Sequence, residues 1–581
     1  MSASTTSPAG IPSPTDPVVA SAVATWAARR DRVEPAAILS AVVALVARSL
    51  DVEVDFVFDG RTVSPDPQTL ADPVDDGVLD VGPWLPGFVR EAMLSDAQRS
   101  GEGAHHTSPE VAAAVVAVAG DVRPWRAGDV VLDPAVGGGA FLLAVADALP
   151  GTPGERVGLL RGCDIDPLAV ATARAALQLW SGGEALGPDA IRVADGLLET
   201  WHEPIDAVIG NPPFLSQLRD GTARDDSRRA SLRDRWPSVG GYVDDALLFL
   251  LAAADTVQTD GVVAMIQPAS VLGARDGGAV RARLEEIAPP AAVWLDGGQR
   301  FAASVDTVAL VLTPGREAAV VSRSVGVPPA PLPDALPEAG SWTPLLLTSA
   351  PVLDRAALAT AGEVGDIAAV TAGFRDQYYG LRDAVHEDPS AALRLMTSGL
   401  IDPLSDRWGR VDCRFDRRAW RHPGVDLDQV DPSIQGWIEA RLVPKLLLAS
   451  QTKTIEAVVD TTGTMVPCTP VVSVEPNAAG AGLAHLAVVL TSPITTALLL
   501  RQAAGTALSS DAMRVTARSI ASLPLPGNQA AWDAAAALVE RRLASPDSVS
   551  VIEIGRASMA AYGVAERSDL HNWWQSRLPA R

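Results

Sequence analysis

The chain has 581 residues, of which 48% are hydrophobic and 20% charged, so it is expected to fold into two to four domains rather than stay disordered. The formal net charge of −23 excludes a surface that is positive everywhere, so any contact with nucleic acid must be local. Lys445 and Lys453 are the only lysines, so arginine must supply nearly all of the positive charge.

The first hundred residues predict a tail and a helical accessory domain. Residues 1–16 are rich in Ser, Thr and Pro, which predicts a disordered tail without the features of a signal peptide. From Val18 to Leu50 apolar residues recur at i, i+3 and i+4, so we assign residues 17–100 to a helical N-terminal domain. Apolar stretches such as Ile38 to Ala47 are too short to span a bilayer, so we expect a soluble protein.

Residues 101–315 alternate short β-branched runs with helical stretches, which predicts an α/β domain with a doubly wound, mostly parallel, Rossmann-like sheet. Seven strands are expected in it. They are Val130–Asp133, Leu159–Asp164, Ile191–Ala194, Ala207–Gly210, Gly261–Gln267, Ala292–Asp296 and Thr307–Thr313.

The rest of the chain predicts a second domain. Residues 316–360, with a Pro-rich stretch from Val327 to Pro337, predict a linker. Residues 361–527 predict a mixed α+β domain, and residues 528–581 a helical tail. The three cysteines are scattered without metal-ligand spacing, so we expect no metal site and a reducing, cytoplasmic setting.

A glycine-rich turn follows the first predicted strand. Asp133 ends that strand, and Pro134, Ala135, Gly137 and Gly139 lead to a helix that begins near Phe141. Glycines let a nucleoside cofactor lie against the backbone, and an acidic strand end can receive an ammonium group. The turn alone also suits a dinucleotide or tight packing.

The next two predicted strands also end in acids. Asp164, followed by Ile165, stands where the ribose hydroxyls of a nucleoside would be accepted, and Asp195, followed by Gly196, could accept an adenine amino group. Each acid alone could be a solvated strand end. Three successive strands that end this way favour a cofactor site.

The sequence Asn211-Pro212-Pro213-Phe214 follows a buried strand and carries the chemistry. An amine conjugated to an aromatic ring is a poor nucleophile, and acceptors for its hydrogens localise its lone pair. The Asn211 amide oxygen and the Pro212 carbonyl can be these acceptors, while the prolines stiffen the turn. Phe214 can stack on a base flipped out of a duplex. The alternative is an ordinary Pro-Pro turn.

These motifs resemble the N6-adenine methyltransferases of DNA in their gamma motif order, in which the cofactor loop precedes the catalytic turn and a target recognition domain follows. Residues 103–108, including Thr107, resemble the motif before the cofactor loop. The chain departs from the family pattern at His105-His106, in the spacing of the loop glycines, and in having Phe214 where many relatives have Tyr. The resemblance implies S-adenosylmethionine as cofactor. It implies these cofactor-binding residues: Thr107, Asp133, Pro134, Ala135, Gly137, Gly139, Phe141, Asp164, Ile165, Asp195 and Gly196.

The C-terminal part resembles the target recognition domains of type II and type IIG restriction-modification enzymes. A segment from Arg407 to Arg421 alternates arginines with aromatic residues, which suits contacts with phosphates and grooves. Its alternative is a solvated face that pairs with the excess acids. The predicted DNA-binding residues are Arg410, Arg414, Arg417, Arg418, Trp420, Arg421 and Lys445.

Together these features predict a site-specific adenine-N6 DNA methyltransferase of a restriction-modification or phage-defence system, with Asn211, Pro212, Pro213 and Phe214 as the catalytic turn. Double-stranded DNA is the expected partner. No lysine precedes Lys445, so a nuclease of the Asp…Glu-x-Lys type is not expected in the N-terminal third, and cleavage would fall to a separate subunit. The alternatives are an RNA or protein amine methyltransferase and a non-catalytic DNA-binding scaffold.

Overall fold

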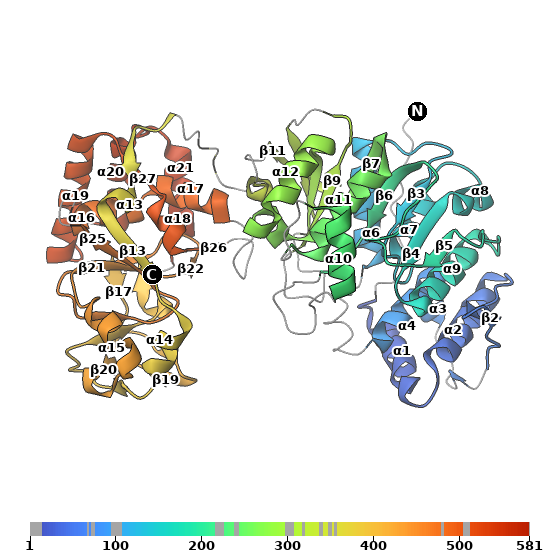
Figure 1. Ribbon diagram of the computed structural model, residues 1–581, viewed down its shortest axis with the longest axis horizontal. Coiled ribbons are helices and arrows are strands. Elements are labelled where there is room, and N and C mark those ends of the chain that lie inside the picture. Colours follow the sequence, from blue (N-terminus) through green and yellow to red (C-terminus); the bar gives the residue numbers. More distant parts are fainter. Residues whose placement is uncertain are drawn as a thin grey trace. The chain divides into compact units, whose positions relative to one another are not determined.

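The chain divides into two units, Met1–Leu345 and Leu346–Arg581, each of which packs mainly on itself (Figure 1). The computed structural model describes residues 14–66, 69–70, 76–94, 107–214, 226–237, 243–296, 307–316, 320–335, 341–346, 351, 353, 357–477, 482–503 and 512–579.

The N-terminal segment is helical, as the sequence predicts, but its helical pattern is broken. Asp16 caps the first helix by accepting from the Val18 amide at 2.9 Å, and Pro35 begins the second, so Val18–Leu50 forms two helices rather than one. Buried side chains of this segment and of the following sheet domain belong to one hydrophobic cluster. The elements are α1 (Pro17–Ala27), η1 (Ala28–Asp31), α2 (Pro35–Leu50), β1 (Val57–Phe58), β2 (Arg61–Thr62), α3 (Asp76–Leu79), η3 (Gly82–Trp84) and α4 (Leu85–Met93).

A central sheet follows, and it is mostly parallel, which confirms the predicted α/β class. Among the described residues its strand order is β11-β10-β8-β9-β7-β6-β3-β4-β5. Its strands are β3 (Val131–Asp133), β4 (Leu160–Asp164), β5 (Ile191–Val193), β6 (Ile205–Gly210), β7 (Val257–Pro268), β8 (Pro290–Leu295), β9 (Thr307–Leu312), β10 (Val321–Val325) and β11 (Ala330–Ala335).

Each of the seven predicted strands is present, but the described part of the sheet has nine, so the predicted count is corrected. The additional strands, β10 and β11, lie within the stretch for which the sequence predicts a linker. Strand β10 pairs with β8, and β11 pairs only with β10 at the edge of the sheet. Proline is tolerated in edge strands because one side of the strand needs no hydrogen bonds, so the prolines there do not prevent strand formation.

Helices cover both faces of this sheet. Strand β9 is buried along its whole length, as expected for a strand between two helical layers. Helices α6, α7 and α9 pack beside one another, and α11 packs against β7 and α12. The helices are α6 (Pro109–Val122), α7 (Ala140–Ala148), α8 (Pro153–Gly158), α9 (Pro167–Ser181), α10 (Asp226–Arg235), α11 (Asp245–Thr256) and α12 (Gly278–Ile287), with short 3₁₀ turns η4 (Ala269–Leu272) and η5 (Arg275–Gly277).

The parallel strands β5, β4, β3 and β6 stand side by side and end at the same edge of the sheet. The chain leaves β3 toward β4 and β5 on one side and returns to β6 on the other. Such a reversal of strand order opens a crevice at the carboxyl ends of the strands, which is where ligands bind in open α/β sheets. The residues after these four strands are therefore the first to consider as a site.

The second unit is a mixture of short strands and helices. Its larger sheets have the orders β13-β25-β21-β23 and β14-β20-β15-β24. Its strands are β12 (Thr360–Glu363), β13 (Ala368–Ala372), β14 (Val385–Glu387), β15 (Arg394–Met396), β16 (Ile401–Asp402), β17 (Ser405–Asp406), β18 (Cys413–Phe415), β19 (Arg418–Trp420), β20 (Pro423–Val425), β21 (Lys445–Leu448), β22 (Gln451–Thr452), β23 (Ala457–Asp460), β24 (Met465–Pro467), β25 (Val472–Pro476), β26 (Met513–Arg514) and β27 (Pro524–Pro526).

Helices of the second unit gather toward its C-terminal part, where α19 packs on α16 and α20 packs on α17. Among the described residues, no single helix is long and apolar enough to cross a membrane, and α16 with α17 meets that test only as a pair bent by 55°. The helices are α13 (Val364–Ile367), α14 (Arg375–Gly380), α15 (Pro432–Glu439), α16 (Leu483–Leu490), α17 (Pro493–Ala503), α18 (Ala517–Ala521), α19 (Gln529–Ala544), α20 (Val551–Ala561) and α21 (Ser568–Arg577), with η8 (Ser398–Leu400) and η9 (Leu427–Gln429).

Lys445 lies inside this unit, which corrects its assignment as a DNA-binding residue. Its side chain is 0% exposed and its ammonium donates to the Asp460 carboxylate at 2.6 Å. Asp460 also accepts from the backbone amides of Gly463 and Met465, so the pair joins β21 and β23 to the turn before β24. Burial lowers the pKa of Lys445, and Asp460 opposes that shift. A fully buried ammonium cannot reach a phosphate.

Replacing Lys445 with Met should therefore destabilise the second unit by about 3–5 kcal/mol, because Asp460 would be left buried without its cation. Urea unfolding of the full chain, followed by tryptophan fluorescence, measures this change. Lys453→Met is the matched control, since Lys453 is exposed. Equal unfolding midpoints for the two variants would show that the buried pair contributes nothing to stability.

Candidate active site

The glycine-rich turn after β3 is shaped by backbone conformations that favour glycine. Gly137 has φ +50° and Gly139 has φ +89°, and Gly139 directly precedes the first turn of α7. The Gly137 amide donates to the Asp164 carboxylate at 2.9 Å, which fastens the turn to the end of β4. The turn after β3 and the end of β4 therefore form one surface.

Asp133 and Asp164 lie next to each other at this surface. Asp133 is 1% exposed and accepts a hydrogen bond from the Ala135 amide at 3.0 Å. Burial raises the pKa of Asp133 to about 7, the Ala135 amide lowers it, and the Asp164 carboxylate raises it. A Cβ on Gly210 would come within 2.6 Å of the Asp133 carboxylate, so the glycine before Asn211 makes room for this acid. A cation at this position would return the Asp133 carboxylate to its charged form.

Asp195, at the end of the β5 segment, is joined to a residue that the sequence does not point to. Arg228 on α10 donates from Nε to the Asp195 carboxylate at 2.9 Å and from a terminal nitrogen to Asp245 at 3.0 Å. Asp245 is 0% exposed, so the guanidinium neutralises a fully buried acid at the same time. Arg228 thus connects the acid that follows β5 to the start of α11.

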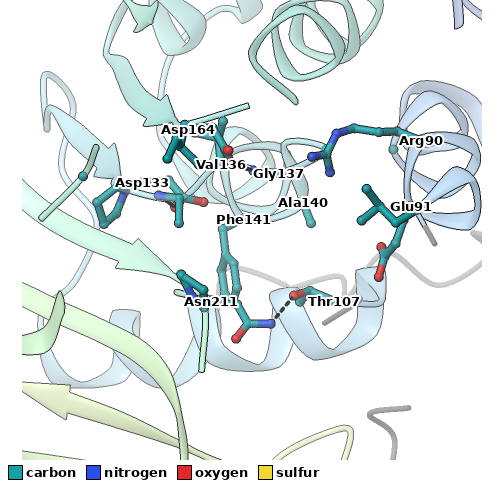
Figure 2. Close-up of a pocket in the computed structure, with 18 of the residues that line it drawn as sticks. Arg90, Glu91, Thr107, Asp133, Val136, Gly137, Ala140, Phe141, Asp164 and Asn211 are labelled. Atoms are coloured by element: carbon teal, nitrogen blue, oxygen red, sulfur yellow. Dashed lines mark hydrogen bonds between the residues drawn. The ribbon is translucent and has the colours of Figure 1, made fainter. Parts of the chain in front are cut away.

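The catalytic turn is held by a contact with Thr107. The Asn211 carboxamide nitrogen donates to the Thr107 hydroxyl at 3.1 Å, as Figure 2 shows. Thr107 is 7% exposed and lies just before α6. The hydrogen bond fixes the rotation of the Asn211 carboxamide and so defines which side its oxygen faces. Residues 103–106 of the predicted motif, with His105 and His106, lie outside the described residues.

These elements enclose a cavity of about 300 Å³, which is within the size of ligand pockets. Ile165 at its rim is 73% exposed, an apolar surface that a flat ring would cover. Gly139, Pro212 and Phe214 do not line the cavity: Pro212 is buried, and Phe214 is half-buried against the core. The predicted residues that do line it are Thr107, Asp133, Pro134, Ala135, Gly137, Phe141, Asp164, Ile165, Asp195, Gly196, Asn211 and Pro213.

The N-terminal segment supplies another wall of the cavity, which the sequence motifs do not predict. Figure 2 shows Arg90 and Glu91 on a helix beside the loop that carries Gly137. That helix is α4, whose buried Leu85, Phe88, Val89 and Met93 recur with helical spacing. The one sequence signal for this wall is Gly87, which lies within the apolar pattern of the helix. Glycine is costly inside a helix, so its presence there indicates that a neighbour comes close. The lining residues from this segment are Trp84, Gly87, Phe88, Arg90, Glu91 and Leu94.

In the second unit, β18 and β19 form a hairpin that carries most of the predicted DNA-binding arginines; we call residues 413–420 the arginine hairpin. Asp416 and Arg417 at its tip have φ 46° and 64°, as in the two-residue turns that suit hairpins. Asp416 is anchored by the Arg382 guanidinium at 2.9 Å and by the Tyr378 hydroxyl, which accepts from its amide at 3.0 Å. The tip is therefore fixed to its own unit.

Side chains alternate across the arginine hairpin, with Phe415 and Cys413 buried and the arginines outside. Trp420 is half-buried and donates to the Phe415 carbonyl at 3.0 Å, so it supports the hairpin from within. Four predicted arginines are exposed and, within the described part of the chain, none of them forms an ion pair. They are Arg410, Arg414, Arg417 and Arg418.

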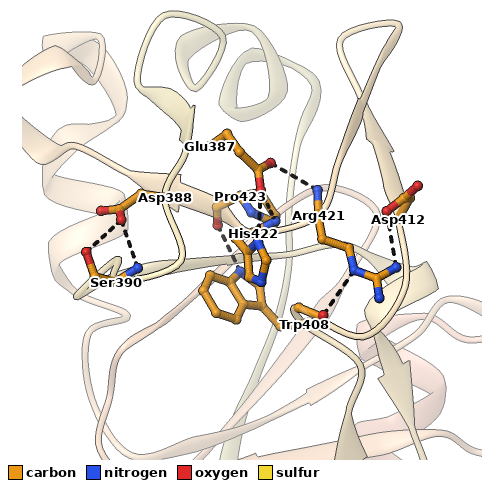
Figure 3. Close-up of polar contacts among 9 residues, drawn as sticks. Glu387, Asp388, Ser390, Trp408, Asp412, Arg421, His422 and Pro423 are labelled. Atoms are coloured by element: carbon orange, nitrogen blue, oxygen red, sulfur yellow. Dashed lines mark hydrogen bonds and ion pairs between the residues drawn. The ribbon is translucent and has the colours of Figure 1, made fainter.

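Arg421, just beyond the hairpin, is instead tied into its surroundings. Figure 3 shows its guanidinium beside Asp412, at 3.3 Å. Its Nε also donates to the Gly409 carbonyl at 3.0 Å. Its backbone amide donates to the Glu387 carboxylate at 3.0 Å. Within this segment Arg407 and Arg421 lie near acids, as the solvated-face alternative expects, while the four arginines named above form no ion pair among the described residues. Their contact with DNA stays a prediction.

Residues 88–319 match the family described as N-6 DNA Methylase. This confirms the resemblance to N6-adenine methyltransferases of DNA for that part of the chain. No curated protein matches the chain.

Solved structures of other proteins also resemble this chain. The type IIL restriction-modification enzyme MmeI, in complex with DNA, is 12% identical with a TM-score of 0.55, over 95% of this chain and 93% of that one. The type IIG restriction endonuclease BpuSI is 14% identical with a TM-score of 0.41, over 97% and 77% of the two chains. The DrdV–DNA complex is 12% identical with a TM-score of 0.48, over 92% and 73%. At such identity the likeness to MmeI shows a shared fold.

The raised pKa of Asp133 gives a prediction for stability. A carboxyl that ionises near 4 when unfolded and near 7 when folded lowers the free energy of unfolding as the pH rises through this window. Asp133→Asn removes the effect. Its free energy of unfolding should gain roughly 2–3 kcal/mol over the wild type between pH 5 and pH 8, measured by urea unfolding. Asp121→Asn, at an exposed position, is the control, and a pH-independent difference for Asp133→Asn would contradict the assignment.

Proposed function

We propose, from the match of residues 88–319 to the N-6 DNA Methylase family, that this chain is a site-specific DNA methyltransferase that acts on the exocyclic N6 of adenine. The observation that carries the proposal is the placement of Asn211 beside the acid-lined cavity, with its carboxamide held by Thr107. A restriction-modification role is supported by the fold shared with MmeI. Methylation of RNA or protein amines and a silent scaffold are not favoured by the family match.

The cavity fits S-adenosylmethionine by its chemistry. Asp133 would receive the ammonium of the amino-acid part, Asp164 the ribose hydroxyls, and Asp195 the adenine amine, while Ile165 would cover the ring. A cationic ligand suits this site, because the buried Asp133 carboxyl gains a partner that stabilises its charged form. When bound, S-adenosylmethionine would supply a methyl group on a positively charged sulfur: as the amine nitrogen takes the methyl, the carbon–sulfur bond breaks, a neutral thioether leaves, and the nitrogen releases one proton to water.

The chain's own residues would act on the target base. An adenine flipped out of the duplex enters beside the catalytic turn, and the Asn211 amide oxygen and the Pro212 carbonyl accept hydrogen bonds from its amino group. These bonds localise the lone pair on nitrogen and orient it, so the rate gain comes from orientation and electrostatics. Thr107 holds the acceptor in place before the base arrives. Phe214, which is half-buried against the core and lies outside the cavity, would stack on the base.

Asn211→Ala should lower the rate of methyl transfer by about a hundredfold or more, because one of the two acceptors is lost. Thr107→Val keeps Asn211 but removes the bond that orients it, so we expect a smaller fall. Transfer of labelled methyl groups to DNA measures both. The control is Asn477→Ala, at an exposed position in the second unit.

Calorimetry with S-adenosylmethionine should show that Asn211→Ala still binds the cofactor. Expression in a host without adenine methylation, followed by detection of N6-methyladenine at single bases, then reports activity and sequence motif together. Full methylation by Asn211→Ala would refute the proposed role of this residue. An unmodified genome with the wild-type chain would count against DNA as the substrate of the chain alone.

For binding DNA, we propose that the arginine hairpin and Arg410 contact phosphates, since these arginines are exposed and carry charge that no neighbouring acid neutralises among the described residues. The proposed surface does not include Trp420, because its side chain supports the hairpin from within. It does not include Lys445, because that side chain is buried. A separate nuclease or other subunit of a defence system remains part of the proposal.

Replacing Arg414 with Gln, Arg417 with Asn and Arg418 with Gln should weaken binding to duplex DNA for any sequence. Asn at position 417 tolerates the left-handed backbone there. The slope of log affinity against log salt should fall by about 0.9 for each phosphate that the variant no longer binds, which a titration at several salt concentrations measures. Arg407→Gln is the control, since Arg407 lies near the Asp402 carboxylate at 3.7 Å. An unchanged slope would remove the hairpin from the DNA surface.

A further inference from the structure

Helix α4 is a structural part of the cavity although it belongs to the N-terminal segment. It approaches the glycine-rich turn so closely that a Cβ on Gly138 would lie 2.6 Å from the Gly87 Cα. A Cβ on Gly87 would in turn lie 3.2 Å from the Gly138 carbonyl oxygen. Two glycines thus meet without side chains between them, and the backbone of α4 rests directly on the turn after β3.

Arg90 on α4 is the basic residue of this wall. It is 7% exposed, and its guanidinium forms an ion pair with Asp166 at 2.5 Å. Its Nε is buried and has no hydrogen-bond partner among the described residues. Burying a cation this far is costly unless it is paired, and the ion pair with Asp166 offsets that cost, so Arg90 and Asp166 are held together in the wall of the cavity.

The ion pair bears on the acid that faces the ribose. Asp166 begins α9 and accepts from the Leu168 amide at 2.9 Å, while its own amide donates to Asp164 at 3.0 Å. Asp164 also accepts from Gly137. Arg90 therefore holds a short turn, Asp164 to Asp166, whose first residue connects the end of β4 to the glycine-rich turn.

We propose that helix α4 is one wall of the cofactor site and that Arg90 is a positioning residue, which holds the turn from Asp164 to Asp166 so that Asp164 can accept the ribose hydroxyls of S-adenosylmethionine. This inference rests on the proposed function. In this proposal the N-terminal segment has a function in cofactor binding, because the cofactor pocket of this chain is incomplete without α4.

Charge supports the same role. Burial raises the pKa of Asp164, and Arg90 is the strongest influence that lowers it again, ahead of the Asp166 and Gly137 amides. The other charged groups that act on Asp164 are Asp133 and Asp166, both of them acids. Glu91, Asp195 and Arg228 line the same cavity. Without Arg90, Asp164 would take up a proton at a higher pH and would accept hydroxyl hydrogens less well. Cofactor affinity should then depend more steeply on pH.

The test is calorimetric titration of the full chain with S-adenosylmethionine at pH 6 and pH 8, without DNA and without turnover. Arg90→Met should weaken binding by about tenfold at pH 8, as expected for the loss of a charged hydrogen bond, and by a larger factor at pH 6. Arg90→Lys keeps the charge and should lose affinity without the added pH dependence. The control is Arg48→Met, at an exposed arginine of the same segment.

The outcomes separate this inference from the proposed function. Thermal unfolding establishes that each variant is folded, and Arg90→Lys decides the question if Arg90→Met is not. Affinity of Arg90→Met within twofold of the wild type at both pH values overturns the inference alone. An equal loss at both pH values reduces Arg90 to a packing role and overturns it too. A wild-type chain that does not bind S-adenosylmethionine overturns the proposed function and this inference with it.

Discussion

The constraint behind the candidate active site is electrostatic: several carboxylates lie together, and are buried, at the carboxyl ends of neighbouring parallel strands. Strands β3, β4 and β6 are parallel neighbours, so their final residues must meet there. Asp133 and Asp164 come close enough that the charge of Asp164 adds to the raised pKa of Asp133. Backbone amides of the glycine-rich turn and a guanidinium from α4 offset the cost of these buried acids. The site is therefore arranged for a ligand that brings positive charge with it.

Both arginines that line the cavity come from outside the strands whose ends form it. Arg90 reaches in from the N-terminal segment, and Arg228 from the helix after the catalytic turn. Arg90 pairs with Asp166, which caps α9. Arg228 pairs with Asp195, which follows β5, and with Asp245, which begins α11. The acids can thus be supplied by strand ends alone, but their arrangement depends on segments that are distant in the sequence.

Sequence patterns predicted the parts of the site that are local. The glycines after Asp133 and the turn at Asn211 are short motifs, and strand periodicity placed them at the sheet edge. The contact between Gly87 and Gly138 could not be predicted, because the sequence around either glycine contains no feature that indicates its partner. The prediction that Lys445 binds DNA is wrong, because a lysine in the sequence does not show whether its side chain is buried. The prediction of a linker omits β10 and β11, because prolines in edge strands resemble those of a linker.

With Lys445 enclosed, Lys453 is the one exposed lysine, so the positive surface of this chain is made almost entirely of guanidinium groups. Guanidinium groups stay protonated across the whole physiological pH range and are not substrates for lysine acetylation. The charge on the arginine hairpin is consequently constant: neither acidification nor acetylation can switch it off. Any response of this protein to pH or to lysine acetylation must therefore arise at other residues than the arginines of this hairpin.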